Sequence, residues 1–395
     1  MVPSPNRSHL LEVFLVFLRL GLTSFGGPVA HLSYFRREFV ERRRWLDEHA
    51  YASLVALCQF LPGPASSQLG MALGLMRAGI GGAIAAFIAF TAPSAILMTG
   101  FALALGRLGD VGHAPWVHGL KLAAVAVVAQ AVWSMARSLT PDLPRAAFAV
   151  AACAAALFLP FAWTQVGVIA LAAAAGAVAL RPAAKAGPPL RLPVPRALGW
   201  LSLILFFALL VALPFAAHLG RTLAVIDAFY RTGALVFGGG HVVLPLLQKA
   251  VADPGWVDRA QFLAGYGAAQ AMPGPLFSFA AFLGAAMKAP PNGIAGAALA
   301  LGAIYLPSFL LVFGAAPLWS AAQGHLKVRA AVTGANAAVV GLLAAALYTP
   351  VWTGAVSTPA DVLIVVVLTG LLVWRNAPPW IVVILAVLFA LVEPR

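Results

Sequence analysis

Residues 58–70 read CQFLPGPASSQLG, and the Pro62-Gly63-Pro64 sequence interrupts an apolar segment that otherwise resembles a membrane helix. Proline lacks a backbone N–H and clashes with the preceding helical turn, at a cost of about 3 kcal/mol in a helix interior. Lipid offers no water to hydrogen-bond the backbone groups that such a break sets free. The break therefore requires a structural or functional reason.

The composition around this break is that of a membrane protein. Hydrophobic residues make up 62% of the 395 residues and charged residues only 9%, whereas soluble domains contain about 45–50% apolar residues. Nearly uncharged stretches long enough to span the lipid bilayer recur along the whole chain. We expect an all-α polytopic membrane protein without a soluble domain at either end. The net charge of +13 fits Lys and Arg gathered in cytoplasmic loops, and we expect no nucleic-acid partner.

Four stretches occur twice, in the same order and at a nearly constant spacing, which indicates an internal duplication. The pairs are RLGLTSFGG (19–27) with RTGALVFGG (231–239), RRRWLDEHAY (42–51) with DPGWVDRAQF (253–262), CQFLPGPASS (58–67) with AQAMPGPLFS (269–278), and TAPSAIL (91–97) with YLPSFLL (305–311). We predict an N-terminal repeat at 1–180 and a C-terminal repeat at 222–395. A basic linker and a connecting transmembrane span occupy 181–221 between them.

The distribution of charge orients the two repeats. The first polar connection carries a group of arginines and is predicted to be cytoplasmic: Arg36, Arg37, Arg42, Arg43 and Arg44. Its counterpart at 249–259 balances its basic residues with aspartates and is predicted to be external. The second repeat is then inverted, and we expect about 9–13 membrane segments. The lower count treats the broken segments as re-entrant, and it is preferred because it keeps the basic 181–196 linker in the cytoplasm.

Inverted repeats with broken helices are typical of secondary transporters, which hold their substrate between the repeats. A helix that begins after Pro64 presents free N–H groups and a partial positive charge, and both suit an anion. We expect a doubly charged oxyanion between the two Pro-Gly-Pro breaks; the alternative is a simple packing kink. The predicted binding residues in the breaks are Gly26, Gly27, Pro62, Gly63, Pro64, Ser66, Ser67, Gly238, Gly239, Pro273, Gly274, Pro275 and Ser278, with the amides of Leu276 and Phe277. The Phe-Gly-Gly glycines serve either this site or close helix packing.

Arg19 and Arg231 occupy equivalent positions inside apolar runs, where an unpaired charge costs at least about 2.5 kcal/mol. A guanidinium binds two oxygens of an oxyanion at once, so both arginines are predicted substrate ligands. The alternatives are that they reach the membrane surface, or that they pair with Glu12 and Asp227.

Other ionisable residues close to the breaks are candidates for proton coupling or for lining the path. Glu12, His31, Asp227 and His241 lie beside the breaks, and acids and histidines inside membranes often relay protons. A surface salt bridge is the alternative for each of them. Lys121 lies inside an apolar span, where it either lines the pore or extends to the interface.

The paired motifs resemble the chromate ion transporter family. The resemblance rests on 25–28 with 61–64 in the first half, and on 237–239 with 273–275 in the second. It covers nearly the whole chain, as in the long, two-domain members. It implies an inner-membrane carrier that expels chromate from bacteria and is driven by the proton-motive force. The second half departs from the first at Gly240, His241 and Met272, which would make the two half-sites unequal.

Several other functions are alternatives to an oxyanion carrier. Sulfate has nearly the size and charge of chromate, so a sulfate transporter is the main alternative, and an anion channel is another. The chain has no HExxH, GxSxG or Walker A motif, so we expect no enzyme activity. Its cysteines, Cys58 and Cys153, lie in separate apolar stretches, so we expect no metal or other cofactor. The prevalence of two-fold assemblies favours a homodimer.

Overall fold

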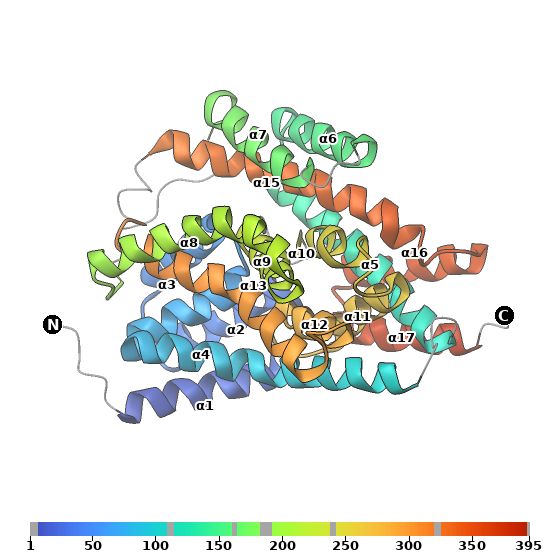
Figure 1. Ribbon diagram of the computed structural model, residues 1–395, viewed down its shortest axis with the longest axis horizontal. Helices are drawn as coiled ribbons and strands as arrows, with labels where there is room; N and C mark the ends of the chain where they lie inside the picture. The colour runs from blue at the N-terminus through green and yellow to red at the C-terminus, as the bar shows by residue number, and fades with distance from the viewer. Residues whose placement is uncertain are drawn as a thin grey trace.

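The computed structural model describes residues 7–108, 114–159, 164–181, 192–237, 242–319 and 325–392. Within these ranges every regular element is a helix, so the predicted all-α membrane fold is confirmed. Figure 1 shows the helices as one assembly. The first half contains α1 (Arg7–Thr23), α2 (Gly27–Arg36), the π-helix η1 (Arg37–Arg42), α3 (Glu48–Phe60), α4 (Ala65–Arg107), α5 (Pro115–Leu139), α6 (Leu143–Phe158) and α7 (Thr164–Ala179).

The connecting helix α8 and the second half follow. They consist of α8 (Arg196–Ala216), the short η2 (Ala217–Leu219), α9 (Arg221–Leu235), α10 (Val243–Leu247), the π-helix η4 (Gln248–Ala252), α11 (Arg259–Ala271), η5 (Leu276–Ser278), α12 (Phe279–Ala286), α13 (Gly293–Ala315), α15 (Leu326–Ala346), η6 (Leu347–Trp352), α16 (Pro359–Trp374) and α17 (Pro379–Val392). The predicted boundaries of the two repeats and of the linker remain predictions.

The broken segments have the same order of elements in both halves. Helices α1 and α2, the π-helix η1 and α3 carry the motifs that recur on α9, α10, η4 and α11. Helix α4 has non-helical backbone at Ala78 and Gly79, where Gly79 has a φ of +65°. In the second half the chain leaves α12 and starts α13 at Gly293, whose φ is +56°. Glycine is suited to both positions because it adopts positive φ without strain.

The last two helices of each half pack against the other half. Helices α6 and α7 lie on α15, and α16 and α17 lie on α5 (Figure 1). Small residues permit this close approach, since a Cβ atom at Gly334 would lie 2.1 Å from the carbonyl oxygen of Ala172. A Cβ atom at Gly119 would lie 2.6 Å from the Cα atom of Val387. The two halves are therefore interlocked.

Among the described residues, five helical stretches are long and apolar enough to cross a membrane. They are α4, α5, α8 with η2, α13, and α15 with η6. Shorter apolar helices, including α6, α7, α16 and α17, account for the other predicted spans. Helix α8 has large exposed side chains, among them Ile204 and Phe215, which suits a helix that faces lipid. The predicted number of crossings stays a prediction.

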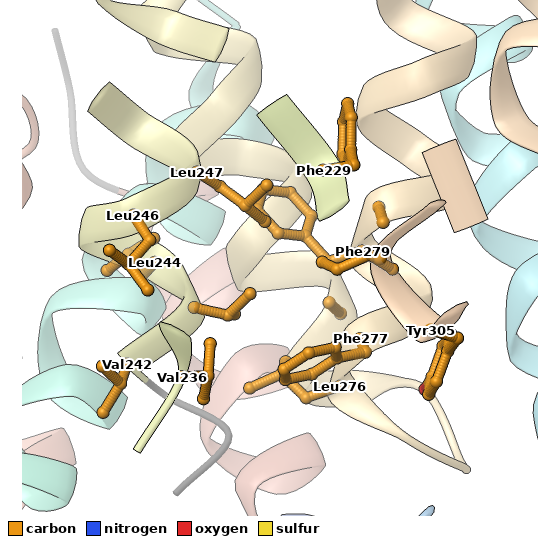
Figure 2. Packing of buried hydrophobic residues seen from close by; sticks show 14 of the residues in the cluster. Phe229, Val236, Val242, Leu244, Leu246, Leu247, Leu276, Phe277, Phe279 and Tyr305 are labelled. Atoms are coloured by element: carbon orange, nitrogen blue, oxygen red, sulfur yellow. The ribbon is translucent and has the colours of Figure 1, made fainter. Parts of the chain in front are cut away.

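Buried side chains hold the second half around its Pro-Gly-Pro break. Figure 2 shows Phe229, Leu247, Phe277, Phe279 and Tyr305 in one apolar cluster contributed by several helices. The rings of Phe277 and Tyr305 have their centroids 5.7 Å apart. This packing fixes the short helix η5, directly after the break, against α13.

Candidate functional site

Each Pro-Gly-Pro break contacts the chain just before the Phe-Gly-Gly motif of the other half. The N–H of Gly63 donates to the carbonyl oxygen of Val236 at 2.6 Å, and the N–H of Gly274 donates to that of Ser24 at 2.9 Å. Ser24 and Val236 each precede the phenylalanine of their motif, so the same contact is made twice with the halves exchanged. Each Pro-Gly-Pro break is therefore hydrogen-bonded to the Phe-Gly-Gly segment of the other half.

Only glycine fits at the centre of either break. Gly63 and Gly274 have φ values of +122° and +94°, which L-residues rarely adopt. A Cβ atom at Gly63 would lie 2.9 Å from the Ser308 hydroxyl, and one at Gly274 would lie 3.0 Å from the Ser94 hydroxyl. Ser94 and Ser308 hold equivalent positions in the two halves, in the repeated Pro-Ser sequence on α4 and α13. Each break is thus seated against a serine of the other half.

The two breaks start their following helices differently. Helix α4 begins at Ala65 directly after Pro64, so the amides of its first turn have no preceding turn to bind. In the second half the short helix η5 comes first, and the N–H of Ser278 donates to the carbonyl oxygen of Pro275 at 3.0 Å. Of the three amides expected there as donors, that of Ser278 is therefore already engaged. The first half offers the better anion-binding helix end.

His31 and the two serines after the first break form a buried polar group. The Nδ1 atom of His31 lies 3.3 Å from the Ser66 hydroxyl, and its Nε2 atom lies 3.2 Å from the carbonyl oxygen of Ser24. The Ser67 hydroxyl lies 3.4 Å from the hydroxyl of Tyr305, on α13. His31 thereby connects the Phe-Gly-Gly and Pro-Gly-Pro segments of the first half.

Polar atoms close to the breaks lack hydrogen-bond partners. Among the described residues, the hydroxyls of Ser24 and Ser308 and the Oε1 atom of Gln68 are buried without one. Such an atom costs about 1–3 kcal/mol unless a water molecule or a ligand satisfies it. The sequence interpretation missed all three residues. Ser308 had a signal, because its Pro-Ser sequence is repeated; Ser24 and Gln68 had none.

The predicted glycines of the first Phe-Gly-Gly motif lie where α2 begins. Gly26 caps this helix with a φ of +100°, and Gly27 follows with a φ of +74°. Gly238, Gly239 and His241 lie outside the described residues.

Arg19 belongs to a group of six charged side chains that we name the ion-pair cluster: Glu12, Arg19, Glu38, Arg42, Arg43 and Arg77. Glu38 accepts from Arg19 at 2.5 Å and from the Nε atom of Arg43 at 2.7 Å. Glu12 accepts from Arg43 at 3.0 Å and from Arg77 at 2.8 Å. Of the two pairings considered from the sequence, Arg19 with Glu12 is wrong, because Arg19 binds Glu38 instead.

Glu38 is the centre of the ion-pair cluster. Its side chain is only 6% exposed, whereas that of Arg19 is 46% exposed. Burial acts to raise the pKa of Glu38, which lies in the polar connection after α2, but hydrogen bonds and charges from Arg43 and Arg19 outweigh it and lower the pKa. The carboxylate therefore stays ionised while its arginines are in place.

Arg231 donates to Asp227, four residues earlier on α9, which confirms the alternative pairing considered for it. Both residues line a cavity of about 380 Å³ between α7, η2, α9 and η4. We name it the second-half cavity, and its lining includes Asp227, Arg231, Lys249, Ala250, Pro254 and Trp256. The Oδ1 atom of Asp227 is buried and has no hydrogen-bond partner among the described residues.

The remaining predicted residue, Lys121, is partly buried on α5, and its role stays a prediction. Close to it is a buried pair that the sequence interpretation missed. The Nε2 atom of His118 on α5 lies 2.6 Å from the Oδ1 atom of Asp361 on α16. The other oxygen of Asp361 accepts from Ser357 and Thr358 at the start of α16. This pair ties together helices of the two halves.

Broken helices that meet inside a bundle of apolar helices define a polytopic membrane protein of the kind that forms solute transporters. The family model described as "Chromate transporter" matches residues 11–179 and again residues 223–391. The chain therefore belongs to the chromate transporter family, as its motifs predicted.

Named relatives agree with this assignment. The chain is 27% identical to the chromate transport protein of Cupriavidus metallidurans, over 97% of this chain and 93% of that one. It is 26% identical to the chromate transport protein of Pseudomonas aeruginosa, over 85% and 79% respectively. A probable chromate transport protein of Synechococcus elongatus is 29% identical over 86% of this chain and 84% of its own length. No solved structure matches the chain significantly. The relatives support a transporter rather than an enzyme.

Proposed function

We propose that this protein is a secondary transporter that exports chromate from the cytoplasm across the bacterial inner membrane in exchange for protons. The observation that carries the proposal is the mirrored contact between the breaks, Gly63 with Val236 and Gly274 with Ser24. It lies beside the buried, unpartnered hydroxyls of Ser24 and Ser308. Family membership supports chromate as the substrate.

The oxyanion occupies the interface between the breaks in this proposal. The start of α4 supplies backbone N–H groups and a partial positive charge, and Ser66 and Ser67 supply hydroxyl donors. The hydroxyls of Ser24 and Ser308 gain the acceptor that they lack. Because the breaks touch each other directly in this structure, the two halves separate slightly when the anion enters.

The arginines serve the two sides of the membrane. In the proposed inverted topology, the ion-pair cluster around Arg19 faces the cytoplasm and the second-half cavity around Arg231 faces outwards. Entry of chromate from the cytoplasm then requires that Arg19 and Arg43 exchange Glu38 for the anion. Dianions suit this exchange, because a guanidinium binds carboxylate and oxyanion oxygens with the same geometry.

Asp227 is the proposed proton-coupling group. Glu12 is bound by two arginines, whereas Asp227 is bound by Arg231 and has one buried oxygen without a hydrogen bond among the described residues. A proton that arrives from outside neutralises Asp227 and releases Arg231 for the anion. Return of the proton to the cytoplasmic side then completes an exchange of chromate against protons.

Expression in a chromate-sensitive bacterium with an impaired sulfate uptake system tests the substrate and the direction. We expect resistance to chromate and no rescue of growth on scarce sulfate. Rescue on sulfate without resistance would replace the proposal by a sulfate importer. Arg19→Ala and Arg231→Ala are each expected to abolish resistance while the protein still accumulates in the membrane, and full resistance with both variants would remove these arginines from the path.

A further inference from the structure

The second-half cavity occupies the place that the ion-pair cluster fills in the first half. The two places correspond residue by residue, starting from Arg19 on α1 and Arg231 on α9. In this register Glu12 corresponds to Ala224, which lines the cavity. An acid that binds two arginines is thus replaced by a methyl group.

The two π-helices and the turns that follow them give the same result for Glu38 and Arg43. Glu38 precedes the fully buried Phe39 on η1, and Ala250 precedes the fully buried Val251 on η4. The residues before each connection's tryptophan also match in backbone shape, since Arg44 and Gly255 have φ values of +52° and +77°. This match pairs the preceding residues, Arg43 and Pro254.

Three charged side chains of the first half, Glu12, Glu38 and Arg43, are therefore replaced in the second half by small or apolar residues. The replacements, Ala224, Ala250 and Pro254, all line the second-half cavity. Both glutamates of the ion-pair cluster are lost. The space is open because the side chains that would fill it are absent.

The lining of the cavity favours an anion. Arg231 and Lys249 bring two positive charges, and Asp227 is the one carboxylate among the described residues that line it. The ring of Trp256 forms part of the wall, and the Cζ atom of Arg221 lies over this ring, 5.0 Å from its centroid. A volume of about 380 Å³ admits a hydrated tetrahedral oxyanion, because each water molecule takes about 30 Å³.

We propose that the second-half cavity is a second binding site for a doubly charged tetrahedral oxyanion, held by Arg231 and Lys249 in the place of the missing glutamates. Asp227 competes with the anion for Arg231, so the anion binds as Asp227 gives the arginine up. The identity of the anion as chromate, and the role of the site as the last stop before release, rest on the proposed function. The charge and shape of the site do not depend on it.

Equilibrium binding of radiolabelled chromate to the purified full chain in detergent tests the site. Lys249→Ala is expected to weaken binding at one of the two proposed sites about tenfold to a hundredfold, because one charge-assisted contact is lost. Lys327→Ala is the matched control, because Lys327 on α15 is exposed and lies outside the cavity lining. It is expected to bind as the wild type does.

A second pair of variants keeps the test independent of the loss of a side chain. Ala250→Glu restores the glutamate of the first half, and Ala250→Gln adds nearly the same volume without its charge. We expect the Glu variant to bind chromate at least about tenfold more weakly than the Gln variant, since the new carboxylate occupies Arg231 and Lys249. Equal affinities of the two, with Lys249→Ala equal to Lys327→Ala, would overturn the site.

Chromate flux into proteoliposomes, measured on the same preparations, separates this inference from the proposed function. Flux by the wild type with unchanged binding in Lys249→Ala and Ala250→Glu would reject the cavity and keep the transporter. Binding that both variants weaken, in a protein without flux, would keep the cavity and reject the transporter. A wild type that binds no chromate would overturn the site.

Discussion

The corner of the first half around Arg19 and the corresponding corner around Arg231 are built from the same elements but filled differently. Around Arg19, glutamates and arginines bind one another across α1, η1 and α4. Around Arg231, alanine and proline leave a cavity with one aspartate and two cations in its lining. The mirrored backbone contacts of the breaks are similar in the two halves, at 2.6 Å and 2.9 Å.

The two halves share the backbone geometry of the breaks, but the side chains around Arg19 and Arg231 differ. The breaks need the same glycines in both halves, because their geometry depends on positive φ. The side chains around Arg19 and Arg231 are under no such constraint. The ion-pair cluster fills the space in the first half, and the second-half cavity remains in the other.

The largest expected effect concerns the ion-pair cluster around Arg19. Glu38→Ala leaves Arg19 and Arg43 without their shared carboxylate, and we expect a loss of about 2–3 kcal/mol in the free energy of unfolding. This is below the 3–5 kcal/mol typical of fully buried pairs, because Arg19 is half-exposed. Thermal unfolding in detergent measures it, with Glu41→Ala as the control, since Glu41 and Arg36 form an exposed pair. Equal stability of the two variants would show that the cluster does not hold the corner closed.

The stabilisation by Glu38 also depends on pH. Its pKa in the folded protein is lowered from the ordinary value of 4.5, so its contribution is present above that pH and is lost as the pH falls further. The difference in stability between the wild type and Glu38→Ala should therefore shrink below about pH 4.5. A difference that stays constant down to pH 3 would contradict the ion-pair role.

The second effect tests the part that the two halves share. Gly63→Ala and Gly274→Ala place a Cβ atom at positive φ and against a serine hydroxyl, so each is expected to cost about 1–3 kcal/mol. Gly100→Ala is the matched control, because a Cβ atom there meets nothing within 4 Å. Similar losses in both halves would support the mirrored contact, whereas a loss in one half alone would break the comparison.

A third, smaller effect concerns the second-half cavity. Asp227→Asn removes the carboxylate that competes for Arg231, so chromate should bind about threefold to tenfold more tightly, which is near 1 kcal/mol. Transport by this variant should respond less to an imposed pH gradient. Asp253→Asn, at an exposed aspartate on the same side of the molecule, serves as the control. Unchanged gradient dependence in Asp227→Asn would move proton coupling to another residue.

The smallest effect is expected at the surface. Glu48 pairs with Arg36 at 2.8 Å, but both side chains are about half exposed, and such pairs contribute little because water and salt screen them. Glu48→Gln should leave both the thermal unfolding and the transport of chromate unchanged. A clear loss of transport would extend the functional region beyond the two corners.

The fold was predictable from the sequence to a large extent. Apolar spans and repeated glycine and proline motifs predicted the helices and the breaks, because helix length and broken backbone leave local signals. The packing of α6 and α7 on α15 of the other half was not predictable. Small residues line many membrane helices, and they do not indicate which helix packs against which.

The predicted binding residues stay predictions, and only the alternative pairings of the two arginines can be compared with the structure. Arg231 and Asp227 were paired correctly from their spacing on one helical turn, whereas the partner of Arg19 was wrong because Glu38 lies on a separate element. The cavity had no direct signal in the sequence. It results from Ala224, Ala250 and Pro254, and small side chains become informative only when the chain around them is placed in space.

Chromate flux into proteoliposomes, with and without an imposed pH gradient and with excess sulfate in a parallel run, tests the proposed transport most directly. We expect chromate to accumulate only when the gradient is present, and we expect sulfate to inhibit weakly. Flux that ignores the gradient, or that prefers sulfate, would contradict proton-coupled chromate export and leave an anion path of another kind.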